Sequence, residues 1–245
     1  MIYQCYFQQN QRERLFQQDP YMGFGLEPEV NLTVTMNCPE LSGRSGRMAM
    51  VEYGCFLHIW RNIDSYNDDW FGFTSYRQLE KTSFMFRSSA EVSAVLDGCD
   101  IAGWGWMDLN KTNQISDYLA STLKGPAFQA EYYHPGMMIF LESLFCGQGQ
   151  RLPQEFYSAE KALYANYWVM RRELFLDFMA WSWPIIKVGL AADHSYKYQV
   201  STDGNNTEKA MGYVIERLFI IWYMMRNLDL KDLSSGEFNP ARRSA

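Results

Sequence analysis

The sequence predicts an α/β fold, with a mostly parallel central sheet flanked by helices. Short segments rich in β-favouring residues occur at 2–7, 70–75 and 165–170, and segments with apolar residues at helical spacing lie between and after them. Strands that alternate with helices are typical of a parallel sheet with helical connections. No shift in composition divides the chain, so we expect one α/β domain over residues 1–232 and a flexible C-terminal tail over residues 233–245.

The remaining elements follow from periodicity and from turn-forming residues. In the first half of the chain we expect a polar helix at 8–18, irregular chain with a candidate strand at 31–36, a helix at 47–62, the strand at 70–75, a helix near Ser89–Leu96, and a second Gly- and Trp-containing strand within 96–110. In the second half we expect helices at 113–123 and 137–146, a helix from Arg171 that Pro184 kinks or ends, a polar loop at 193–207, and a helix at 208–228.

Composition and charge exclude several classes of protein. The 245 residues carry a formal net charge of −6, which argues against a protein that binds nucleic acid through the phosphate backbone. No apolar run is long enough to span a bilayer and the first residues lack the features of a signal peptide, so we expect a cytoplasmic protein without a transmembrane segment. The five cysteines are widely spaced and never form a CxxC pair, which argues against a disulfide framework and a structural zinc site.

The aromatic content is high, at 16% of the residues. We expect some of these rings to line a cleft, where their faces suit sugars and bases. The alternative is an aromatic-rich core.

The segment from Asp68 to Lys81 is the strongest candidate for a binding site. Its aromatic run reads as a buried strand that delivers Tyr76, Arg77 and Lys81 into the loop at its C-terminal end. Ligands of open α/β sheets bind beyond those strand ends, and a guanidinium, a phenol and an ammonium there could receive a phosphorylated ligand. The alternative is an edge strand followed by a solvated polar turn.

Common catalytic motifs are absent from the sequence. There is no GxGxxG after a strand, no Walker loop, no HExxH and no GxSxG, and the three histidines have no paired spacing. Asp97 and Asp100 lie on a turn before a strand, where two carboxylates could hold a divalent cation, Mn²⁺ or Mg²⁺, that carries a diphosphate. The alternative is a helix cap followed by an ordinary turn.

Glu216 is the candidate general base. It lies on the last helix, off the centre of the apolar stripe, and could accept a proton if it faces a cleft. The alternative is a neighbour of Arg217 on a solvated helix face.

Four blocks of sequence, taken in order, resemble the capsular-polysaccharide type of glycosyltransferase. They are Val51-Glu52-Tyr53 to Trp60-Arg61-Asn62, Trp70-Phe71-Gly72-Phe73 with Tyr76-Arg77, Asn166-Tyr167-Trp168-Val169-Met170 to Phe175, and Gly212-Tyr213 with Glu216-Arg217-Leu218. The chain departs from that family at Ser75-Tyr76-Arg77-Gln78, where the family tends to have His-Tyr-Arg-Arg. It also lacks the Asp-x-Asp metal signature, to which Asp97-x-x-Asp100 is the nearest approach.

This resemblance implies a single-domain fold similar to GT-A and a transferase that moves a sugar from a nucleotide-diphosphate sugar to a saccharide acceptor in polysaccharide or glycan synthesis. It implies that Tyr76, Arg77 and Lys81 contact the donor, that Asp100 with Asp97 assists a cation, and that Glu216 acts on the acceptor hydroxyl. These residues are then expected to face one common hollow. The alternative is a non-catalytic carbohydrate-binding or assembly protein on a degenerate transferase fold.

Overall fold

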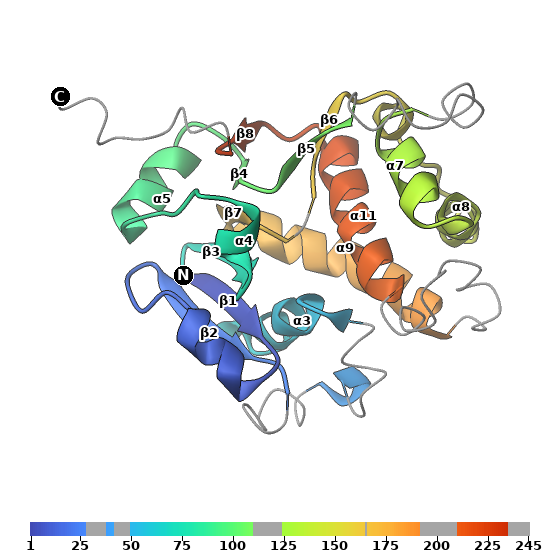
Figure 1. Ribbon diagram of the computed structural model, residues 1–245. Coiled ribbons are helices and arrows are strands. Elements are labelled where there is room, and N and C mark those ends of the chain that lie inside the picture. Colours follow the sequence, from blue (N-terminus) through green and yellow to red (C-terminus); the bar gives the residue numbers. More distant parts are fainter. Residues whose placement is uncertain (28–37, 42–49, 110–123, 165, 192–209, 235–245) are drawn as a thin grey trace.

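A computed structural model describes residues 1–27, 38–41, 50–109, 124–164, 166–191 and 210–234, and the contacts discussed below belong to these residues (Figure 1). Three of the expected elements, at 31–36, 113–123 and 193–207, lie outside the described residues.

A six-stranded sheet forms the centre of the molecule, in the order β2-β1-β3-β7-β4-β8. β1 pairs in parallel with β2 and β3, β4 pairs in parallel with β8, and β7 is antiparallel to both β3 and β4. Five strands therefore run one way and β7 runs the other, which confirms the predicted mostly parallel sheet. The strands are β1 (Ile2–Tyr6), β2 (Tyr21–Gly25), β3 (Trp70–Ser75), β4 (Ile101–Gly103), β7 (Trp168–Arg171) and β8 (Leu230–Asp232).

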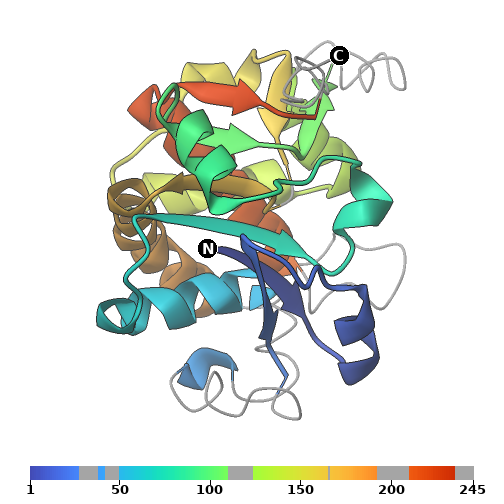
Figure 2. The same ribbon diagram turned by 90° about the vertical axis from the view of Figure 1, so that its left-hand side faces the viewer.

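Helices cover both faces of this sheet. α5 lies on one face, in front of the strands in Figure 2, and α3, α9 and α11 lie on the other (Figures 1 and 2). A two-stranded antiparallel ribbon, β5 (Trp106–Asp108) with β6 (Lys161–Leu163), extends the fold beside α7 and α11. The α-helices are α3 (Tyr53–Arg61), α4 (Gln78–Lys81), α5 (Ser89–Leu96), α7 (Gly125–Tyr133), α8 (Met137–Cys146), α9 (Arg172–Ala191) and α11 (Ala210–Arg226), and short 3₁₀ turns occupy Gln9–Arg14, Pro39–Leu41, Ile63–Ser65 and Gln154–Tyr157.

Alternate side chains of β7 pack into the cores on opposite faces of the sheet. Trp168 and Met170 point into the core formed with α3, α9 and α11, whereas Val169 points to the side covered by α5. The Trp168 ring lies 4.9 Å from the Phe219 ring of α11, with the two planes 11° apart. Burial of these rings against the sheet supplies the apolar contact that orders α9 and α11.

Several sequence-based boundaries are wrong, for physical reasons that the structure shows. The helix expected at 47–62 is interrupted at Val51, whose positive φ of 46° a helix does not accommodate: Met50 is helical, α3 begins at Tyr53, and residues 47–49 lie outside the described part of the chain. Of the two outcomes expected at Pro184, a kink or an end of the helix, the end does not occur, since α9 continues to Ala191 and packs against α3, α8 and α11. The segment 8–18 forms a 3₁₀ turn over Gln9–Arg14.

Two strands of the sheet were not predicted. β2 reads YMGFG, and its glycines suggest a turn, but a Cβ at Gly23 would lie 2.6 Å from the Leu15 side chain. The glycine there permits close packing of the preceding 3₁₀ turn on the strand. β8 begins just after α11, and Leu233, expected in the flexible tail, is buried and donates its N–H to the Gly103 carbonyl.

One of the described helices, α9, is long and apolar enough to cross a bilayer by the criteria of length and composition. In this structure it packs against β3, β7, α3 and α11 as part of the core.

The close contact of β3 with its neighbours gives a stability prediction. A Cβ at Gly72 would lie 2.5 Å from Val169 Cγ1 and 2.7 Å from Ile2 Cγ1, so Gly72→Ala overpacks the centre of the sheet. We expect a loss of about 1–3 kcal/mol in the free energy of unfolding, measured by denaturant titration. The matched control is Gly98→Ala, where the nearest atom lies 3.8 Å away and the change should stay within about 0.5 kcal/mol. Equal losses in both variants would contradict this packing.

Candidate functional site

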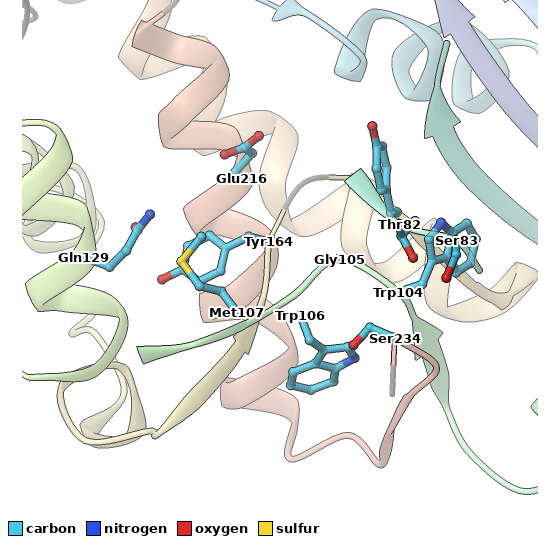
Figure 3. A pocket seen from close by; sticks show the side chains of 11 residues that line it. Thr82, Ser83, Trp104, Gly105, Trp106, Met107, Gln129, Tyr164, Glu216 and Ser234 are labelled. Carbon is cyan, nitrogen blue, oxygen red and sulfur yellow. The ribbon is translucent and has the colours of Figure 1, made fainter. Parts of the chain in front are cut away.

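A cavity of about 560 Å³ opens at the edge of the sheet where the parallel strands end (Figure 3). Gly103 of β4 leads into it and Ser234 follows β8, while Tyr167 directly precedes the antiparallel β7. In open α/β folds the loops at this edge hold the ligand. The lining residues are Thr82, Ser83, Trp104, Gly105, Trp106, Met107, Gln129, Tyr164, Tyr167, Glu216 and Ser234.

Aromatic side chains form much of the wall, and hydrogen bonds hold two of them in place. The half-buried Trp106 donates its indole N–H to the Gly103 carbonyl over 3.1 Å. The Tyr167 hydroxyl lies 2.7 Å from Ser75 Oγ, at the end of β3. Rings that are fixed in this way present preformed apolar faces to a ligand.

Gly105 lets two segments of the wall approach each other. The Tyr164 N–H donates to the Gly105 carbonyl over 2.9 Å, and a Cβ at Gly105 would collide with the Tyr164 carbonyl oxygen. Only glycine fits this close approach of backbone to backbone.

Glu216 faces the cavity from α11, and a buried guanidinium holds it there. Arg217 is 2% exposed and donates through one terminal nitrogen to Glu216 Oε2 at 2.9 Å. Its other terminal nitrogen donates to Gln129 Oε1 on α7 at 2.6 Å. Glu216 itself is 26% exposed, and among the described residues its second oxygen, Oε1, has no hydrogen-bond partner.

Arg217 has two further contacts that fix its position. One of its terminal nitrogens donates to the Tyr213 carbonyl at 3.2 Å, and its guanidinium carbon lies 5.3 Å from the centre of the Tyr164 ring. A buried charge is stable only when it is paired and hydrogen-bonded, as this one is. Arg217 is therefore buried beside Glu216 and does not share a solvated helix face with it.

Burial sets the protonation of the two phenols at the cavity. It raises the pKa of Tyr164, against a smaller lowering by the Arg217 charge. Burial also raises the pKa of Tyr167, with the hydrogen bond from Ser75 and the Arg77 charge acting in the opposite direction and Glu216 in the same one. Both phenols stay protonated at neutral pH and serve as hydrogen-bonding groups rather than bases.

Two of the predicted donor-binding residues, Tyr76 and Arg77, lie at the same edge, next to the cavity rather than in its wall. Tyr76 and Arg77 directly follow β3, and Arg77 Nε donates to Glu80 at 2.6 Å. Arg14 pairs with the same Glu80, and its guanidinium carbon lies 5.1 Å from the centre of the Tyr76 ring.

Lys81 ends α4, and the two residues after it, Thr82 and Ser83, line the cavity. The Arg77 charge also reaches the Tyr167 hydroxyl, whose pKa burial raises and Arg77 lowers. The end of β3 is thus electrostatically linked to the cavity.

The predicted metal residues lie at the other edge. Asp97 and Asp100 precede β4, whereas the cavity follows it, so the strand separates them from Glu216. Asp97 is 74% exposed and pairs with Arg171 at 2.8 Å, and Asp100 Oδ2 accepts the Asp229 N–H at 2.8 Å. Each carboxylate has a protein partner, and neither Asp97 nor Asp100 lines the cavity at Glu216.

The expected common hollow is therefore formed only in part. Glu216 lines it and Arg77 lies close by, but Asp100 lies apart. Within the described ranges, no group of three or more His, Cys, Asp or Glu side chains is placed to hold a metal ion.

The sequence did not predict the hydrogen bond between Arg217 and Gln129 behind Glu216. Arg217 and Gln129 are 88 residues apart in the chain, and only the packing of α7 on α11 brings them together. The one local signal was that Arg217 lies next to Leu218 and three residues after Val214, both in the apolar stripe of the helix.

The six-stranded sheet with its single antiparallel strand gives the chain a fold similar to that of a solved glycosyltransferase. Among solved structures, the chain is similar to the apo form of WbbM, a bifunctional glycosyltransferase, with a TM-score of 0.52 and 15% sequence identity. The likeness covers 94% of this chain and 44% of WbbM, so this chain spans less than half of that protein. No family model and no curated protein sequence matches the chain.

Loss of the buried guanidinium should destabilise the fold. Arg217→Ala removes the guanidinium that donates to Gln129 and Glu216 and opens a void beside Tyr164, so we expect a cost of about 2–5 kcal/mol in the free energy of unfolding. Arg226→Ala, on the same helix, breaks an exposed pair with Asp177 and should cost about 1 kcal/mol or less. Comparable costs for the two variants, measured by denaturant titration, would show that Arg217 does not have the role described.

Acid should weaken the fold through His134. This ring stacks on Tyr213 at 3.9 Å, and burial together with the Arg217 charge lowers the pKa of His134 from 6.5 to about 4. The unfolded chain therefore takes up this proton first, and stability is lost as the pH falls from about 6.5 to about 4.

His134→Gln should flatten that part of the pH dependence, followed as the urea midpoint at each pH. His58→Gln is the comparison variant, because burial lowers the pKa of His58 as well, away from the cavity. Parallel curves for the wild-type chain and His134→Gln would contradict the assignment.

Proposed function

We propose that this chain is a glycosyltransferase that moves a sugar from a nucleotide-diphosphate sugar to a saccharide acceptor. The observation that carries the proposal is a cavity at the carboxyl edge of the sheet in which Glu216 is held by the buried Arg217. The likeness in fold to a glycosyltransferase supports the same class of reaction.

In the proposed reaction Glu216 acts on the acceptor. An acceptor hydroxyl donates its proton to Glu216 Oε1 while its oxygen attacks the anomeric carbon of the donor sugar, and the bond from that carbon to the diphosphate oxygen breaks. Arg217 is a positioning residue, since it fixes Oε2 and thereby directs Oε1.

The donor diphosphate is assigned to the end of β3. Tyr76, Arg77 and Lys81 occupy the segment that leads to Thr82 and Ser83 of the cavity wall. A guanidinium and an ammonium there would stabilise the negative charge that develops on the leaving diphosphate.

A binding experiment tests the donor assignment. The melting temperature is measured with uridine, guanosine and thymidine diphosphates, each with Mn²⁺, with Mg²⁺ and with EDTA, so that any need for a cation is measured directly. We expect at least one nucleotide to raise the melting temperature by binding the folded chain, and Arg77→Ala to reduce that increase. Arg87→Ala, which replaces an exposed arginine elsewhere, should keep the full shift. No shift with any nucleotide would favour a non-catalytic carbohydrate-binding protein on the same fold.

A transfer assay tests the base. Glu216→Gln keeps the size of the side chain and should lower kcat about 10²–10⁴-fold, because the amide cannot accept the hydroxyl proton. Glu142→Gln makes the same replacement of a carboxylate by an amide at a separate cavity and should leave kcat unchanged. Full activity of Glu216→Gln would exclude Glu216 as the base.

A further inference from the structure

We infer that the cavity at Glu216 takes a saccharide that carries no negative charge, a neutral or an amino sugar, and rejects uronic acids and phosphorylated sugars. This inference rests on the proposed function, because it names the acceptor class of the same site. Three features of the cavity support this inference: the Glu216 carboxylate that faces the cavity, the buried Arg217 behind that carboxylate, and the uncharged side chains that form the rest of the wall.

Glu216 is the charge that faces the cavity. Among the described residues that line it, the others are hydroxyl, amide, thioether, aromatic or glycine residues, and none is a lysine or an arginine. A ligand in contact with this wall therefore meets one carboxylate, whose Oε1 has no hydrogen-bond partner among the described residues.

Arg217, the nearest cation, is not available to a ligand. It is 2% exposed, and its two terminal nitrogens are used by Glu216, Gln129 and the Tyr213 carbonyl. The remaining Nε has no hydrogen-bond partner among the described residues, but it is buried. A carboxylate on a sugar could reach this guanidinium only by displacing a partner of the terminal nitrogens or by entering the buried space at Nε.

The rest of the cavity suits an uncharged sugar. In Figure 3, Glu216 lies on one side and Trp106 on the other, with Ser234 beside Trp106 and with Thr82 and Ser83 along a third side. The indole face of Trp106 offers apolar area to the C–H face of a pyranose, and the hydroxyls can exchange hydrogen bonds with sugar hydroxyls. The volume of about 560 Å³ lies within the range of about 300–1,000 Å³ usual for small-ligand sites.

Electrostatics then separates the sugar classes. A second carboxylate within a few ångströms of Glu216, in a partly enclosed site, is repelled and loses hydration without gaining a cation. An amino sugar gains an attraction at the same place. We expect acidic sugars to bind at least about tenfold more weakly than neutral sugars with the same skeleton.

The test is a binding experiment without donor. The full chain is applied to a glycan array that carries the same disaccharide skeletons in neutral, 2-amino, uronic-acid and phosphorylated forms, such as galactobiose beside digalacturonate. Calorimetry then gives Kd for each bound member and its acidic counterpart. We expect the bound members to be neutral or amino sugars.

Two variants connect the result to Glu216. Glu216→Gln should bring the ratio of acidic to neutral Kd close to one, whereas Glu142→Gln, which removes a carboxylate from the other cavity, should leave the ratio unchanged. Acidic sugars that bind as tightly as neutral ones, or an array on which no sugar binds at millimolar chain concentration, would overturn the inference.

The inference and the proposed function fail separately. Selective binding of neutral sugars with no transfer from any donor would contradict the proposed glycosyltransferase activity but support the inferred sugar preference. Transfer to a uronic acid would support the activity and contradict the sugar preference.

Discussion

The antiparallel strand β7 is the constraint on which the rest of the structure depends. It alone joins β2-β1-β3 to β4-β8, and its pairing with β3 and β4 fixes both halves of the sheet. Because β7 runs against its neighbours, it begins at the edge where they end. Tyr167, directly before β7, therefore lies beside the residues that follow β3 and β4, and these segments together enclose the cavity.

The same strand links the cavity to the core helices. Trp168 stacks on Phe219 of α11, and two residues before Phe219 the same helix carries Arg217 into the protein beside Tyr164. α11 is thus held by apolar contact at the sheet and by a paired guanidinium at the cavity. This arrangement places Glu216 at the wall of the cavity with Oε2 fixed by Arg217 and Oε1 without a partner in the described part of the chain, as a base or a hydrogen-bond acceptor requires.

Sequence reasoning succeeded where the signal was local. The strands at β1, β3 and β7 and the helices α5, α8 and α11 follow from side-chain periodicity, and Glu216 was identified as a residue that could face a cleft. It failed where distant segments decide the outcome. Burial of Arg217 depends on Gln129 of α7, and β2 depends on Leu15 packing where a side chain at Gly23 would stand. Asp97 and Asp100 were misplaced because a turn before a parallel strand lies at the opposite edge from the loop after it.

The central claim is that a saccharide meets Glu216 in the cavity at the carboxyl edge of the sheet. The most direct measurement is the crystal structure of this chain soaked with neutral disaccharides and a mixture of sugar nucleotides. The account predicts a sugar ring between Trp106 and Glu216, with a hydroxyl within hydrogen-bond distance of the Glu216 carboxylate. A saccharide bound instead beside Asp97 and Asp100, with the cavity at Glu216 empty, would contradict it.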